Sequence, residues 1–210
     1  MLVYPAIDLY SRGNRKQPWD KTTTYQYHEG QYYNFREQPE LIETSLEDFI
    51  EYSDKPAVQT FYSLLKWLNG DLSALESTDC MFSGSPHPND AAIVFHCTHL
   101  SSGRLEFFIR NLEYNKEERA IGWVLCKLSL YLQIERPDFR KGTFSIVPLV
   151  TEYLSAGGDE ISGYRICVYF EAYGNGIDDT WLSLNIMFNG IMEALKRMNA
   201  EMFSSKTIPL

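Results

Sequence analysis

Apolar residues recur at helical spacing in three stretches of the chain. The most regular stripe follows Asp178 and Asp179, either of which can cap a helix that runs to about residue 203. Its apolar positions recur at spacings of four and three residues and are Leu184, Phe188, Ile191, Leu195 and Met198. These positions share one side of a helix, so the pattern predicts a C-terminal helix that packs this stripe into the protein.

Two earlier stretches have the same periodicity. Pro56 suits a first helical turn and Gly70 suits a C-terminal end, which predicts a helix over residues 56–70. Asn115 can cap a longer helix over residues 116–134. The apolar stripe of that helix comprises Ile121, Val124, Leu125, Leu128 and Leu132. We expect this stripe to lie on a sheet.

β-Branched and aromatic residues gather in four runs that read as strands. In chain order the runs are AAIVFHCTH (91–99), RLEFFIRNL (104–112), TFSIVPLVTEYL (143–154) and YRICVYFEAYG (164–174). The first two flank a short turn at Ser101–Gly103, and the last two flank a turn at Ala156–Asp159. Short turns predict two antiparallel pairs. Pro148 has no N–H for a ladder, so we expect an edge or a bulge there.

The first 55 residues have a less regular pattern. Residues 1–36 form a tyrosine-rich segment in which Glu29-Gly30 separates two aromatic runs, as in a hairpin. Thr44 and Glu47 have the spacing of a capping box, and the apolar positions that follow are Leu46, Phe49 and Ile50. A helix that begins near Thr44 with these residues on its inward face would form a helical pair over residues 44–70.

These elements predict a single domain of the α+β class that spans residues 1–210. From residue 91 to residue 203 the expected order is strand, strand, helix, strand, strand, helix. This order gives a mainly antiparallel sheet of four or more strands with helices packed on it. Hydrophobic residues make up 44% of the chain and aromatic residues 14%, which suffices for a substantial core without disulfides or metals.

Charge and cysteine usage indicate the compartment and the partner class. The N-terminus lacks the pattern of a secretory signal, and no apolar run is long enough to span a membrane. Four widely spaced cysteines are typical of reduced thiols, so we expect a cytoplasmic protein. A net charge of −9 disfavours binding to nucleic acid or to anionic membranes and favours a basic protein partner.

Few groups have the spacing that catalysis or metal binding requires. His96 and Cys97 would point to opposite faces of a strand, which leaves Cys97 and His99 short of the four ligands of a zinc site. Gly174-Asn175-Gly176 precedes a helix, but Asp179 places negative charge where a phosphate would bind. We therefore expect no metal, no cofactor and no catalytic residue in this chain.

A run of acidic residues is the most distinctive local feature. Between Arg36 and Lys55 there are seven acids and no base: Glu37, Glu40, Glu43, Glu47, Asp48, Glu51 and Asp54. One interpretation is a solvated helix face. The other is a docking face for a basic protein, formed by Glu43, Glu47, Asp48, Glu51 and Asp54 with Tyr52 as an aromatic anchor.

The acidic segment ETSLEDFIEYSD, the tryptophan-bearing helix FYSLLKWLNG and the α+β layout resemble the immunity proteins that neutralise bacterial toxins. The resemblance implies stoichiometric inhibition of a basic toxin domain, with the acidic face covering its active site. The chief alternative is a structural or adaptor protein that self-associates, for example as a homodimer, through the C-terminal helix. A third hypothesis is an enzyme whose site the sequence does not reveal.

Overall fold

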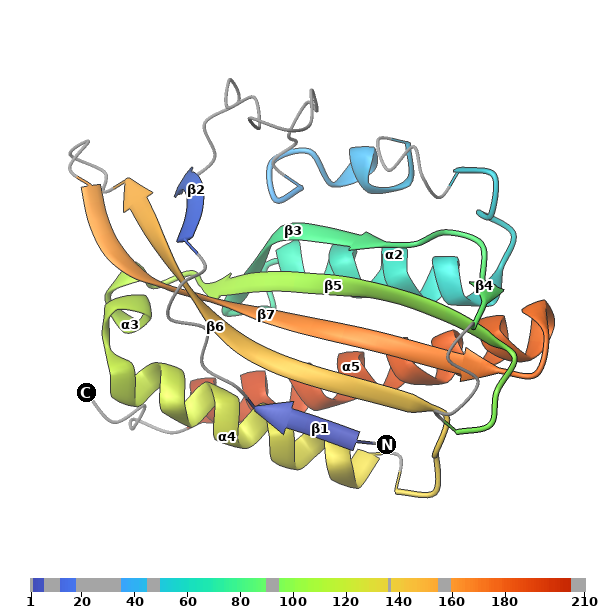
Figure 1. Ribbon diagram of the computed structural model, residues 1–210. Coiled ribbons are helices and arrows are strands. Elements are labelled where there is room, and N and C mark those ends of the chain that lie inside the picture. The colour runs from blue at the N-terminus through green and yellow to red at the C-terminus, as the bar shows by residue number, and fades with distance from the viewer. Residues whose placement is uncertain are drawn as a thin grey trace.

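One sheet forms the frame of the fold. The computed structural model describes residues 2–5, 12–17, 35–44, 50–89, 95–135, 137–154 and 160–204. Seven strands of these residues form a single sheet (Figure 1). They are β1 (Leu2–Pro5), β2 (Arg12–Gln17), β3 (Leu75–Phe82), β4 (His87–Pro88), β5 (His99–Ile109), β6 (Gly142–Leu154) and β7 (Glu160–Gly174). With helices packed on it, this mainly antiparallel sheet confirms the predicted α+β domain.

The strands cross the sheet in the order β1-β6-β7-β5-β3, and β2 and β4 pair with β6 and β5. The second predicted hairpin is confirmed, because β6 and β7 pair antiparallel from Gly142 opposite Ala172 to Leu154 opposite Glu160. Its turn at residues 156–159 lies outside the described residues. β5 pairs antiparallel with both β7 and β3, so β5 and β7 form the centre of the sheet.

The pattern of residues 1–36 did not predict the two N-terminal strands. β1 runs parallel to residues 143–146 of β6, and β2 runs parallel to residues 150–153 of the same strand. The β2 sequence RGNRKQ has no alternation of apolar and polar residues, so periodicity could not reveal it. The hairpin expected around Glu29-Gly30 lies outside the described residues.

Pro148 marks an interruption along one side of β6. On one side, Pro148 pairs with Ile166 of β7. On the other side, the pairing of β6 with β1 ends at Ile146, and its pairing with β2 begins at Val150. Pro148 lies between these two stretches. In the described chain neither N-terminal strand pairs with it. A residue without an N–H is suited to such a gap. The expected edge is therefore local, because β6 itself has neighbours on both sides.

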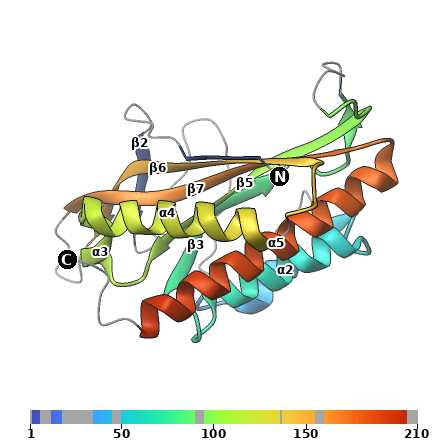
Figure 2. The same cartoon turned by 90° about the horizontal axis from the view of Figure 1, so that it is seen from below.

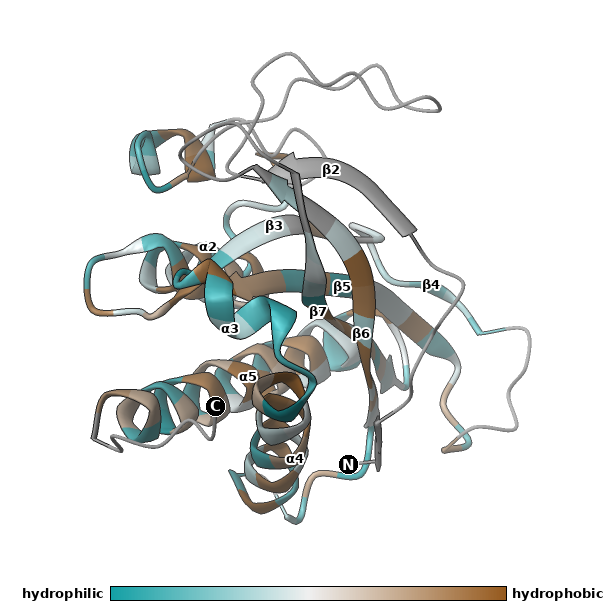
Figure 3. Cartoon of the chain, turned by 90° about the vertical axis from the view of Figure 1, so that its left-hand side faces the viewer, coloured by the Kyte–Doolittle hydropathy of each residue, from teal (hydrophilic) through white to brown (hydrophobic). Residues whose placement is uncertain are grey.

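Three long helices cover one face of the sheet. α2 (Pro56–Asn69), α4 (Glu118–Glu135) and α5 (Ile177–Ser204) confirm three of the four predicted helices. α5 lies between α2 and α4 beneath the sheet (Figure 2). The edge-on view shows all three on the same side, each with hydrophobic and hydrophilic residues around its axis (Figure 3). Two short helices complete the described elements, the 3-10 helix η1 (Pro39–Glu43) and α3 (Leu112–Lys116).

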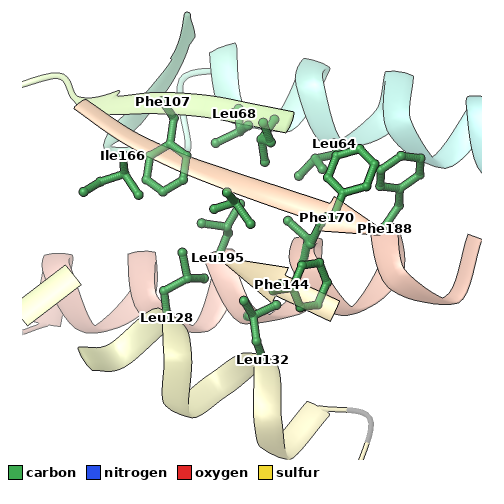
Figure 4. Close-up of a cluster of buried hydrophobic side chains, with 14 of the residues drawn as sticks. Leu64, Leu68, Phe107, Leu128, Leu132, Phe144, Ile166, Phe170, Phe188 and Leu195 are labelled. Atoms are coloured by element: carbon green, nitrogen blue, oxygen red, sulfur yellow. The ribbon is translucent and has the colours of Figure 1, made fainter. Parts of the chain in front are cut away.

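The core lies between this helical layer and the sheet. The ring centroid of Phe188 is 5.0 Å from that of Phe61 of α2. It is 5.1 Å from that of Phe170 of β7, and Figure 4 shows these two residues in the core. The predicted α5 stripe is buried at every position, as are four of the five positions of the α4 stripe, Leu125 being half-buried. Burial of each large side chain contributes about 1.5–3 kcal/mol, so α5 joins the other layers chiefly through this stripe.

The strand expected over residues 91–99 is wrong in its described part. Phe95 and His96 have φ values of 57° and 52°, which belong to a turn, and the strand begins only at His99. The turn expected at Ser101–Gly103 is wrong as well, because these residues continue β5 and pair with residues 170–172 of β7. Small residues here mark a close-packed strand, since the Ser101 side chain is fully buried.

Two further features differ from the sequence-based expectation. The sequence did not predict β3, because polar residues such as Glu76 and Ser77 obscure the alternation of apolar and polar positions that marks a strand. Both residues are nevertheless buried. Asn115 does not cap the long helix, and Asn111 caps α3 instead by accepting a hydrogen bond from the Glu113 amide. The Asn115 side chain is buried and bonds the N–H and C=O of Ile109, which holds α3 against the end of β5.

Candidate functional site

The described parts of the acidic segment (residues 37–54) are residues 37–44 and 50–54, and η1 within the first part contacts α2. Its first part forms η1, where a Pro at the first position suits the helix start, and residues 51–54 form turns. The side chains of Glu37, Glu40, Glu43, Glu51 and Asp54 are exposed. Glu47 and Asp48 lie outside the described residues, as does most of the helix expected from Thr44. The structure therefore places part of the predicted docking face on the surface.

Apolar contacts at both ends hold this segment on the protein. Ile42 is fully buried in the main core. Tyr52 is half-buried, and its ring lies 5.5 Å from that of Trp181 of α5. A hydrogen bond with Glu51, together with partial burial, raises the pKa of the Tyr52 hydroxyl. Ile50 was expected to face inward but is 49% exposed, so the inward face predicted from helical spacing is wrong at this residue.

One predicted docking residue is already engaged within the protein. Glu43 forms an ion pair with Lys66 of α2, and both side chains are about half exposed, at 48% each. An exposed pair of this kind contributes about 0–1 kcal/mol to stability. It nevertheless offsets the charge of Glu43. The side chains of Glu37, Glu40, Glu51 and Asp54 are exposed as well.

Sequence reasoning missed a cluster of charged side chains on the sheet face opposite the long helices. The Glu106 carboxylate of β5 lies 2.9 Å from Arg165 Nε of β7 and 3.3 Å from Arg104 Nε. Glu106 and Arg165 are almost fully buried, at 4% and 5% exposure of their side chains. Such charges are stable inside a protein only when paired. The signal in the sequence was their position between apolar residues in RLEFF and YRICV.

A hollow of about 320 Å³ opens on the same face of the sheet. Two rows of side chains from β3, β5 and β7 form its walls. Met81, Arg104 and Tyr169 are register partners and make one row. Ser83, Ser102 and Glu171 make the other, since Ser102 is paired with Glu171 and the Ser83 amide bonds the Ser102 carbonyl. Gly103 and Phe170 lie between the rows. We call this hollow the transverse groove, because it crosses the strands.

Side chains at one end of the transverse groove are well anchored. Tyr169 is 42% exposed, and burial of the rest, with its neighbour Cys167, raises the pKa of its hydroxyl to about 12. Glu171 accepts hydrogen bonds from the hydroxyls of Thr143, at 2.9 Å, and Tyr173, at 2.6 Å. Tyr169 thus remains a neutral donor at physiological pH, and the orientation of Glu171 is fixed from the β6 side of the sheet.

A second hollow, of about 480 Å³, lies where α2, β3 and α3 meet. Arg110 and Arg36 both approach the buried Glu76 carboxylate, at 3.7 Å and 3.6 Å. Arg110 also donates to the carbonyls of Leu68, in the last turn of α2, and of Gly70, the C-cap residue of that helix. Burial lowers the pKa of Arg110. These bonds close the end of α2, so a structural role explains this cluster.

The cysteines are all among the described residues, and two of them are buried. The four cysteines are free thiols, and burial raises the pKa of both Cys97 and Cys167. A raised pKa makes a thiol less nucleophilic. Cys126 is exposed on α4. Among the described residues no group of three or more His, Cys, Asp or Glu side chains is placed to hold a metal ion.

Asp179 occupies the start of α5 as predicted. Its carboxylate accepts hydrogen bonds from the Asn175 amide and from Lys141 Nζ, both at 2.7 Å, and these bonds lower its pKa. A side chain at Gly174 would collide with the backbone of Thr180, 2.3 Å from the position of its Cβ. This glycine therefore permits close packing of β7 on α5. Close packing accounts for a glycine at this position without a bound phosphate.

Two remaining observations bear on the class of protein. No helix among the described residues is long and apolar enough to cross a membrane. Comparison with known proteins found no matching family model, no matching curated protein and no matching solved structure.

Proposed function

We propose that this chain is a stoichiometric inhibitor of the immunity type, which binds a basic bacterial toxin domain in the cytoplasm through its acidic surface. The observation that carries the proposal is the exposure of Glu37, Glu40, Glu51 and Asp54 along one segment anchored at Ile42 and Tyr52. Anchored carboxylates lose little conformational freedom when a partner binds, and they attract a basic surface over the Debye length of about 8 Å.

The overall charge of −9 supports the same partner class, because it steers basic proteins toward the chain and repels phosphates. By this mechanism the inhibitor covers the basic substrate site of its toxin, and its carboxylates occupy the positions of substrate phosphates. Glu47 and Asp48 are included in the proposed surface on the basis of the sequence alone.

Self-association through α5 has less support. The regular stripe of α5 packs into the core of the same chain, so it offers no continuous surface to a second copy. The exposed apolar residues of α5, Ile177, Leu182 and Phe203, are spread along the helix. Scattered exposed residues of this kind are ordinary on protein surfaces. Enzymatic activity remains the third hypothesis, with no described constellation to assign to it.

The proposal can be tested by capture and charge reversal. Protein captured by this chain from its native host at low salt should be basic and toxic, and co-expression of the chain should relieve its toxicity. Glu51→Lys with Asp54→Lys should then slow association and flatten its dependence on salt. A matched control, Glu113→Lys with Glu193→Lys, makes the same change of net charge on other surfaces. Equal association rates for the two double variants would contradict docking through the acidic segment.

A further inference from the structure

We infer that the transverse groove binds an arginine side chain of the partner protein, with Glu171 as the counter-ion and Tyr169 as the stacking surface. The inference rests on the proposed function for the class of partner, and it adds a second contact surface with a defined chemistry. The groove lies over β3, β5 and β7, on the sheet face opposite the long helices.

The two walls of the groove differ in character. In a strand, residues two apart share a face, so each residue of one row has a neighbour in the other row, across the groove. These pairs are Met81 with Ser83, Arg104 with Ser102, and Tyr169 with Glu171. One wall thus presents the Met81 side chain and the Tyr169 ring, each 42% exposed, with Arg104 between them. The other presents Ser102 and Ser83, whose hydroxyl is 3.3 Å from that of Ser101, and ends at the Glu171 carboxylate. A side chain with an aliphatic stem and a polar cationic head matches this sequence of surfaces.

Arginine matches the aromatic ring and the carboxylate of the groove better than lysine does. A guanidinium is planar, so it can stack on an aromatic ring while its edge donates to a carboxylate. Tyr169 and Glu171 are two residues apart on β7, so both side chains lie on the groove face of the sheet. Glu171 uses Oε2 for its bonds from Thr143 and Tyr173. Those bonds fix the carboxylate in place, which preorganises the site before an arginine arrives.

Arg104 also lines the groove, and its charge opposes that of an incoming arginine. Its Nε lies 3.3 Å from the Glu106 carboxylate, which draws the positive charge toward the buried glutamate. Glu106 is shared with Arg165, however, so an acidic ligand at Arg104 is the competing outcome. The net charge of −9 and the anchored Glu171 favour the cation. The experiment must therefore compare ligands of both signs.

Blocked single amino acids test the groove without the partner. The probe is N-acetyl-arginine N-methylamide, and its controls are the citrulline, lysine and glutamate analogues. The reporter is the ¹³C-labelled methyl group of Met81, which lines the groove, while the methyl groups of the buried Met187 and Met198 report the fold. We expect a saturable shift of the Met81 signal with arginine, weaker binding of lysine by several-fold, and no binding of citrulline.

Two variants assign the binding to the proposed residues. Glu171→Gln keeps an acceptor for Thr143 and Tyr173 but removes the charge, and should weaken arginine binding at least 10-fold. Glu193→Gln changes an exposed α5 carboxylate and should leave binding unchanged. Equal binding of citrulline, tighter binding of glutamate, or unchanged binding by the Glu171 variant would overturn the inference. The ligand comparison on the unaltered protein decides the matter if that variant fails to fold.

These results are separate from those that test the proposed function. If arginine does not bind the groove but the captured toxin still depends on Glu51 and Asp54, the inhibitor proposal stands and the groove assignment fails. If arginine binds through Glu171 but no basic toxin is captured, the groove is a cation site and the inhibitor proposal fails.

Discussion

Glu106 and Arg165, on adjacent strands, form an ion pair of 2.9 Å that is almost fully removed from solvent. Removal of one member leaves the other charge buried with fewer partners. We expect Arg165→Met to lower the free energy of unfolding by about 3–5 kcal/mol, as measured by urea denaturation. The double variant with Glu106→Leu should recover a large part of this loss.

Lys196 provides the control for that measurement, because its pair with Glu193 is exposed and has a distance of 3.4 Å. Lys196→Met should change the free energy of unfolding by less than about 0.5 kcal/mol. A similar small change for Arg165→Met would show that the buried pair contributes nothing beyond an exposed one.

The α5 stripe should carry much of the stability of the helical layer. Ile191 is 1% exposed, so Ile191→Ala should cost about 2–5 kcal/mol through lost burial and the cavity that remains. Leu182→Ala on the same helix, where the side chain is 57% exposed, should cost far less. An unchanged denaturation midpoint for Ile191→Ala would show that this stripe does not stabilise the core, and would support self-association through α5.

The start of α5 should depend on pH through Asp179. The Asn175 amide and Lys141 lower the pKa of this carboxyl from 3.8, so folding favours its ionised form. The stabilisation is present above pH 3.8 and is lost as the pH falls through the lower folded-state pKa. Asp179→Asn should therefore be less stable than the parent protein at pH 6, and the gap should narrow at pH 3. A gap of constant size between these two pH values would rule out this linkage.

Thiol reactivity should follow exposure. We expect Cys126, exposed on α4, to react first with a thiol reagent under native conditions, and Cys80 more slowly. Cys97 and Cys167 should react only on unfolding, because they are buried and burial raises the pKa of both thiols. Counting labelled sites by mass spectrometry over time checks the order. Early labelling of Cys167 would mean that the sheet face opens readily.

Periodic elements could be predicted from the sequence, whereas elements defined by pairing could not. The α5 stripe and the pair β6–β7 repeat their pattern over many residues, and both were found. The run AAIVFHCTH has the composition of a strand, but Phe95 and His96 adopt positive φ, because local propensity is overridden where the chain must turn into β5. β2, with a polar sequence, is defined by its pairing with β6.

The candidate site shows the same division. Exposure of Glu51 and Asp54 agrees with the sequence-based hypothesis, because charged residues stay at the surface. The transverse groove could not be foreseen, since its walls join residues from three strands and depend on register. Shifting β3 by one residue relative to β5 would turn Met81 to the other face of the sheet.

The parallel pairing of β1 with β6 also constrains how the protein is made. Leu2 pairs with Thr143, so the first strand emerges from the ribosome long before its partner exists. At about 5–20 residues per second, the intervening 140 residues take roughly 7–28 seconds to synthesise. Throughout that interval the N-terminal strand has no edge to join. A translational pause within this stretch would lengthen the time during which chaperones or neighbouring chains can reach it.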